Sequence, residues 1–152
     1  MFRGACLSLF LLGAACVPLV GCNEKAAEER TVSVQLESAL SKKSLSLIEQ
    51  AQKGEVFKVV KNLNGNVEYI EAKPLSETQL KHLKALVLDD KNYLFGFRKR
   101  CPFIPETGFS LSGPQGQITL LLSHSCKQIR FVEAFRGKTL DIDPSVEKFK
   151  RI

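Results

Sequence analysis

The sequence predicts an α+β domain, in which two to three helices pack on one face of an antiparallel sheet of about five to six strands. Apolar and polar residues alternate on both sides of two short turns, at Asn64-Gly65 and at Gly113 to Gly116, as in antiparallel hairpins. Apolar residues at helical spacing occupy three other segments, so the order is helix, two strands, helix, three or four strands, helix. With 152 residues, of which 44% are hydrophobic and 25% charged, the chain can form one core.

The first helix is expected from about residue 36 to residue 52, and Gly54 is expected to end it. Its apolar positions follow helical spacing: Leu36, Leu40, Leu47, Ile48 and Ala51. Residues 55–61 then alternate as a strand, and residues 67–72 form the return strand after the Asn-Gly turn. This part of the chain therefore predicts a helix followed by a hairpin.

The second helix begins with a capping box, because Gln79 stands three positions after Ser76. Its buried side carries Leu80, Leu83 and Val87, and the helix is expected to end near Leu88. His82 lies between these core positions. We expect it to be solvated or simply packed rather than to act as a ligand.

The most regular hairpin follows at residues 108–123. If Gly113 pairs with Gly116, Leu111 faces Ile118 and Phe109 faces Leu120 on one side of the sheet. Residues 127–135 continue as a strand, residues 136–138 turn, and residues 139–142 return. Asp143 is then expected to cap a short terminal helix whose first turn contains Pro144.

The N-terminus has the three parts of a secretory signal peptide: Arg3, an apolar run from Ala5 to Val17, and small residues before Cys22. The "LVGC" of residues 19–22 resembles the lipobox of bacterial lipoproteins. The resemblance implies that Cys22 receives diacylglycerol, becomes the first residue after cleavage, and is then N-acylated. Because one acyl chain binds membranes only marginally, these lipids would provide a stable anchor.

The resemblance implies a cleaved signal peptide (1–21) and a lipidated residue 22, and the polar composition and the patterns above then indicate a tether (22–35) and one globular domain (36–152). It implies a location in the bacterial envelope, and Asn23 favours the outer membrane because inner-membrane retention typically uses Asp at this position. We expect the domain to face the periplasm. The alternatives are retention in the inner membrane and an uncleaved transmembrane helix. Apart from the acyl chains on Cys22, we expect no cofactor.

The roles of the five cysteines can be assigned once the signal peptide is removed. Cys6 and Cys16 leave with it and Cys22 is lipidated, which leaves Cys101 and Cys126 for a disulfide in an oxidising compartment. The hairpin register would place Cys101 opposite Gln128 and Cys126 opposite Phe103, and a bend at Pro102 and Pro105 would join the sulfurs.

Two other uses of the thiols have weaker support. No CxxC redox motif is present. A zinc site would need His82, His124, Cys101 and Cys126 at a spacing unlike that of known zinc sites. We therefore expect no metal centre.

The positive charge of the chain is concentrated towards its C-terminus. Residues 91–152 hold 11 Lys and Arg against 5 Asp and Glu, and the densest stretch is Arg98, Lys99 and Arg100. We expect these three residues to form a partner-binding surface on a loop, for an envelope protein or an anionic polymer. The surplus is modest and Trp is absent, so nucleic acid is not an expected partner.

The predicted function is a non-enzymatic binding or accessory domain of an envelope lipoprotein. Ser123, His124 and Cys126 are too close in sequence to form a catalytic triad, which distant segments normally assemble, and no catalytic residue is assigned. Two alternatives remain open. One is an inhibitor or immunity protein against an envelope hydrolase, and the other is an enzyme that uses His124 or Cys126.

Overall fold

The computed structural model describes residues 34–61, 66–96, 99–134 and 136–152. The helices are α1 (Val34–Ala39), α2 (Lys42–Glu49), α3 (Glu77–Val87), the short 3-10 helix η1 (Asp90–Asn92) and α4 (Val146–Phe149). The strands are β1 (Lys53–Lys61), β2 (Val67–Pro74), β3 (Thr107–Gly113), β4 (Gly116–Ser123), β5 (Gln128–Glu133) and β6 (Arg136–Asp141). The predicted signal peptide, Cys22, the Asn64-Gly65 turn and Arg98 lie outside the described residues.

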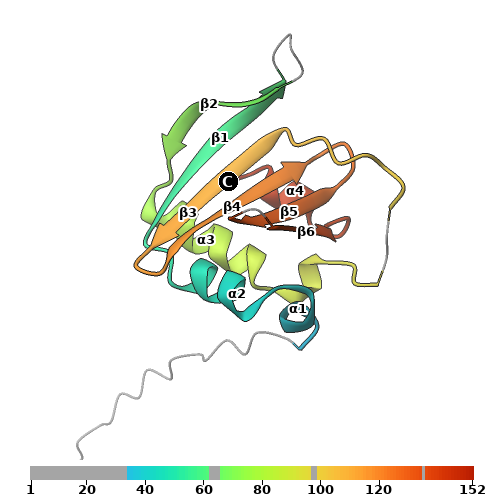
Figure 1. Cartoon of the computed structure of the whole chain (residues 1–152), viewed down its shortest axis with the longest axis horizontal. Helices are drawn as coiled ribbons and strands as arrows, with labels where there is room; N and C mark the ends of the chain where they lie inside the picture. Colours follow the sequence, from blue (N-terminus) through green and yellow to red (C-terminus); the bar gives the residue numbers. More distant parts are fainter. Residues whose placement is uncertain (1–33, 62–65, 97–98, 135) are drawn as a thin grey trace, which may run out of the picture. The chain divides into compact units, whose positions relative to one another are not determined.

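The strands form one antiparallel sheet in the order β2-β1-β3-β4-β5-β6 (Figure 1). Apart from the α3 crossover, which brings β3 back beside β1, each strand pairs with its neighbour in the sequence. The predicted α+β class and antiparallel sheet are confirmed, with four described α-helices beside the sheet. Among the described residues, no helix is long and apolar enough to cross a bilayer.

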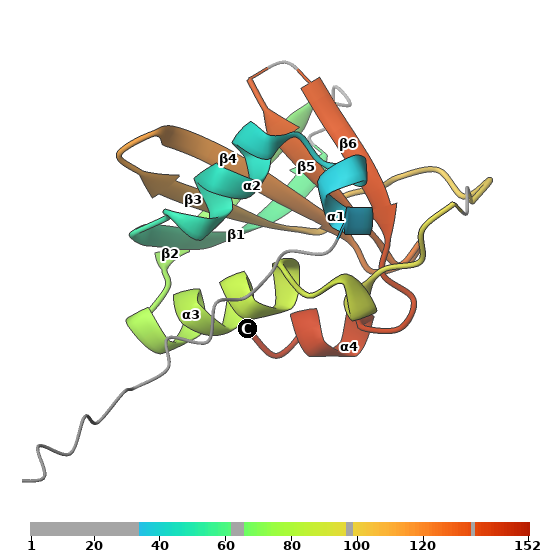
Figure 2. The ribbon, with the colours of Figure 1, turned by 90° about the horizontal axis from the view of Figure 1, so that it is seen from below.

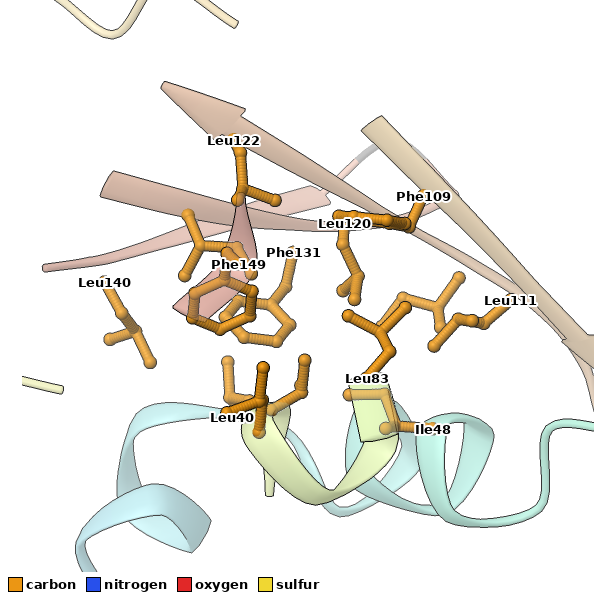
Figure 3. Close-up of a cluster of buried hydrophobic side chains, with 14 of the residues drawn as sticks. Leu40, Ile48, Leu83, Phe109, Leu111, Leu120, Leu122, Phe131, Leu140 and Phe149 are labelled. Atoms are coloured by element: carbon orange, nitrogen blue, oxygen red, sulfur yellow. The ribbon is translucent and has the colours of Figure 1, made fainter. Parts of the chain in front are cut away.

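The main core lies between the helices and one face of the sheet (Figure 2). Figure 3 shows Leu40, Ile48 and Leu83 on the helical side of this core and Phe109, Leu120 and Phe131 on the sheet side. Residues 31–152 form one compact unit that contains every described strand, helix and core residue. Because the whole of the described core lies within this segment, we expect the segment to fold without the residues that precede it.

The other face of the sheet carries a smaller apolar cluster, formed by Phe57, Val59 and Leu121. Phe103 and Val132 pack against it. The absence of a side chain at Gly108 makes room for the Phe57 ring, since a Cβ there would lie 2.2 Å from that ring. The loop that contains Phe103 thus covers part of the sheet face that the helices leave open.

The predicted helix at residues 36–52 is two helices, and it starts earlier than expected, at Val34 in the predicted tether. The break comes at Ser41, which has an extended backbone and accepts a hydrogen bond on its Oγ from the Ser44 N–H at 2.9 Å. This serine caps the N-terminus of α2, so the chain turns there instead of continuing. The turn lets Leu40 and Leu45 both enter the core.

The capping box of α3 is confirmed: Ser76 Oγ accepts from the Gln79 N–H, and the Gln79 side chain accepts from the Ser76 N–H. The predicted register of the β3–β4 hairpin is also confirmed, since Leu111 pairs with Ile118 and Phe109 with Leu120. His82 is exposed on α3.

Three details of the C-terminal half differ from the prediction. β3 begins only at Thr107, so Cys101 does not pair with Gln128, which instead pairs with Ser123. β6 begins at Arg136, in the stretch predicted to be a turn. The last helix begins at Val146 with Ser145 at its N-cap position, because the Asp143 carboxylate is engaged elsewhere.

Candidate functional site

The disulfide corner is the place where the loop before β3 meets the turn between β4 and β5. We use this name for Lys99, Cys101, Cys126, Asp141 and Asp143. Cys101 and Cys126 form the predicted disulfide, with their Cα atoms 5.9 Å apart. Glu106 strengthens the junction, because its Oε1 accepts a hydrogen bond from the Ser125 N–H at 3.0 Å.

Lys99 fills the centre of this corner. Its Nζ lies 2.9 Å from Asp141 Oδ2 and 2.9 Å from Asp143 Oδ2, and it donates to the Cys126 carbonyl at 3.0 Å. The side chain is 16% exposed and that of Asp141 only 2%. Burial disfavours the ammonium, but its hydrogen bonds to Asp143 and Asp141 outweigh this and raise the pKa of Lys99. The same bond lowers the pKa of Asp143.

These contacts change the view of the basic stretch at residues 98–100. We expected Lys99 to present its charge on an open loop, but the structure turns it inward onto two carboxylates. Arg100 is exposed, and Arg98 lies outside the described residues. Lys99 therefore holds the loop in place, and a partner-binding role remains a prediction for Arg100 and Arg98.

His124 sits beside the corner and is half-buried. Its Nε2 shares a hydrogen bond of 3.1 Å with Thr107 Oγ1, while its Nδ1 is buried and has no partner among the described residues. Burial lowers the pKa of His124, because the imidazolium loses solvation there. Hydrogen bonds from Ser125 outweigh the effect of burial on Glu106 and lower the pKa of that carboxyl.

The Ser123, His124 and Cys126 side chains do not converge on one reacting position. Ser123 Oγ lies 3.3 Å from Ser125 Oγ, His124 bonds to Thr107, and Cys126 is in the disulfide. A disulfide-bonded sulfur has no thiolate to act as a nucleophile. In the part of the chain that the structure describes, no three His, Cys, Asp or Glu side chains are grouped so that they could hold a metal ion.

A concave site lies elsewhere, at the end of β5 and β6 and beside the α1–α2 junction. We call it the β5–β6 pocket, with a volume of about 520 Å³. It is lined by Leu40, Ser41, Lys43, Ser44, Phe131, Glu133, Ala134, Arg136, Gly137 and Lys138. This volume falls within the range of about 300–1,000 Å³ that is typical of small-molecule sites.

Strand register explains why charged side chains stand at this pocket. Phe131 faces Lys138 and Glu133 faces Arg136 across the β5–β6 pair. Directly opposed residues in an antiparallel pair point to the same face, and residues two apart on one strand do so too. Phe131 is in the main core, so Glu133, Arg136 and Lys138 also point to the helix-covered face.

The charges at the pocket are unevenly compensated. Glu133 accepts a hydrogen bond from Ser44 Oγ at 2.8 Å and forms an ion pair with Lys43. The hydrogen bonds from Lys43 and Ser44 lower the pKa of Glu133 and keep it ionised. Arg136 and Lys138 are exposed and have no ion-pair partner among the described residues. The pocket thus has a surplus of positive charge at its rim.

Sequence reasoning did not find this pocket, because its walls come from residues about 90 positions apart. The one local signal of a charged site is an alternation along β6. Arg136 and Lys138 stand at alternate positions before Leu140, where apolar residues would be expected on the face that packs on the core. Comparisons of the chain with protein-family models, with curated proteins and with solved structures found no match.

Proposed function

We propose that the protein is a lipid-anchored lipoprotein of the bacterial envelope, with a non-enzymatic binding domain that faces the periplasm from the outer membrane. The observation that carries the anchor is the "LVGC" stretch, which places Cys22 directly after an apolar signal-like segment. The disulfide between Cys101 and Cys126 supports export, because such bonds persist in oxidising compartments.

Binding is favoured over catalysis by what the corner residues already do. Cys126 is consumed by the disulfide, and His124 bonds to Thr107 while burial lowers its pKa. Cys126 therefore offers no thiolate, and no third group among the described residues bonds to Nδ1 of His124 to orient it as a base, as the alternative enzyme hypothesis requires. The concave surface with unpaired charge is the β5–β6 pocket, which supports a role in holding a ligand.

The anchor is tested by labelling cells that express the protein with a radioactive or alkyne-bearing palmitate. The wild-type chain should be labelled and should fractionate with the outer membrane. Cys22→Ser should abolish the label, whereas the matched control Cys16→Ser, within the cleaved signal segment, should keep it. Equal labelling of the Cys22→Ser and wild-type chains would refute the anchor.

A further inference from the structure

We propose that the β5–β6 pocket binds a single-chain anionic amphiphile, a molecule with one apolar tail and one carboxylate or phosphate head. This inference deepens the binding role proposed above and rests on it, but it does not depend on the lipid anchor. Three observations carry it: an apolar floor, a compensated carboxylate on the wall, and two uncompensated cations at the rim.

The floor of the pocket is apolar. Leu40 and Phe131 line it, and both belong to the main core, with 5% and 2% of their surfaces exposed. These side chains can accept a hydrocarbon tail but offer no hydrogen bonds to a polar ligand. An apolar floor with a few polar groups at its edge is the usual design of a small-molecule site.

The wall carries one carboxylate, and its charge is already balanced. Glu133 is bonded to Ser44 and paired with Lys43, so the anion does not stand unpaired against the head group. These bonds also hold Glu133 against α2, because Ser44 and Lys43 belong to that helix. A cationic head would find no free carboxylate here.

The rim supplies the attraction for an anionic head. Arg136 and Lys138 lie two positions apart on β6, so both side chains project from the same face of that strand. Both are exposed, and neither forms an ion pair among the described residues. A guanidinium can bind a carboxylate or phosphate through two parallel hydrogen bonds, and the neighbouring ammonium adds a second charge.

The test uses residues 31–152, the compact unit that contains the whole core. The domain is purified in its oxidised form and shown to unfold cooperatively and to lack free thiols. Binding of dodecanoate and of dodecyl phosphate is then measured by isothermal titration calorimetry below their micelle concentrations. These two ligands show whether the pocket prefers a carboxylate or a phosphate head group. Dodecyltrimethylammonium serves as the cationic control.

Saturable one-to-one binding of at least one anionic ligand is expected, with much weaker binding of the cationic one. Shortening the tail should weaken affinity by about fourfold per methylene removed, if each methylene is buried. The double variant Arg136→Glu/Lys138→Glu should lose affinity by about tenfold. The control Lys81→Glu/Lys91→Glu changes net charge equally at exposed positions away from the pocket and should bind as the wild type does.

Three results would overturn the inference: no saturable binding by the folded domain up to about 1 mM ligand, equal affinity for anionic and cationic heads, or equal losses in the two double variants. Lack of binding would refute the pocket ligand and leave the proposed anchor untouched. Failure of palmitate labelling would refute the anchor and leave the pocket ligand standing.

Discussion

Replacing Lys99 with Met tests whether this residue is a structural cation or a partner-binding one. The substitution keeps the apolar stem and removes the ammonium, which leaves Asp141 buried with its Oδ2 lacking any other partner among the described residues. Removing one partner of a buried ion pair typically costs about 3–5 kcal/mol. Asp143 is 35% exposed, so solvent weakens its interaction with Lys99. We expect a loss near the lower end, about 3 kcal/mol.

The loss is measured by denaturant titration and by thermal unfolding of the oxidised domain. For a domain of this size, about 3 kcal/mol corresponds to a fall in Tm of about 10 °C. Arg100→Met is the matched control, because Arg100 is the exposed neighbour, and it should change stability by less than about 0.5 kcal/mol. A Lys99→Met domain as stable as the control would refute the structural role.

Asp141→Asn provides a second check on the same interaction. In the double variant with Lys99→Met, the buried charge is gone from both sides, so the two losses should not add. We expect the double variant to be more stable than the sum of the single losses predicts, by about 1–3 kcal/mol. Additive losses would show that Lys99 and Asp141 do not interact.

Three further predictions concern stability. Replacing both Cys101 and Cys126 with Ala should lower the free energy of unfolding by about 3.5 kcal/mol on the chain-entropy model, measured by denaturant titration against the oxidised wild type. Burial lowers the pKa of His124, so the unfolded chain binds its proton more readily and stability should fall as pH drops below about 6.5. His124→Gln should flatten this part of the profile. Ser76→Ala removes the α3 cap and should cost about 1 kcal/mol.

Each of these has a contrary outcome. A reduced wild type as stable as the oxidised one would show that the disulfide adds nothing. A Tm that does not change between about pH 7.5 and about pH 5.5, a range above the titration of ordinary carboxyl groups, would contradict the burial of His124. A Ser76→Ala variant with wild-type stability would mean that the capping hydrogen bonds make no net contribution to α3.

The register of the β3–β4 hairpin was predictable because a short Gly-bounded turn leaves few ways to pair the two strands. Gly113 and Gly116 close the turn, and the apolar alternation then selects the pairing that buries one face. The same rule failed on the N-terminal side of Thr107, because it assumes that the strand continues there. Pro102 and Pro105 prevent this, and the disulfide joins the loop before β3 to the turn between β4 and β5.

Long-range polar contacts were the part that the sequence could not predict. Lys99 looked like the middle of an exposed basic stretch, and its partners Asp141 and Asp143 stand more than 40 positions later. The prediction that Asp143 caps the last helix failed for the same reason, because the carboxylate binds Lys99. A cap motif states a local preference, and here an ion pair with a distant cation overrides it.

Intact mass spectrometry of the protein extracted from its own membranes tests the central claim most directly. The proposed lipoprotein should give the mass of the chain that begins at Cys22, increased by a diacylglyceryl group and one N-linked acyl chain. Fragmentation should place both additions on Cys22. An unmodified chain, a chain that still carries residues 1–21, or a mature N-terminus at another residue would contradict the proposal.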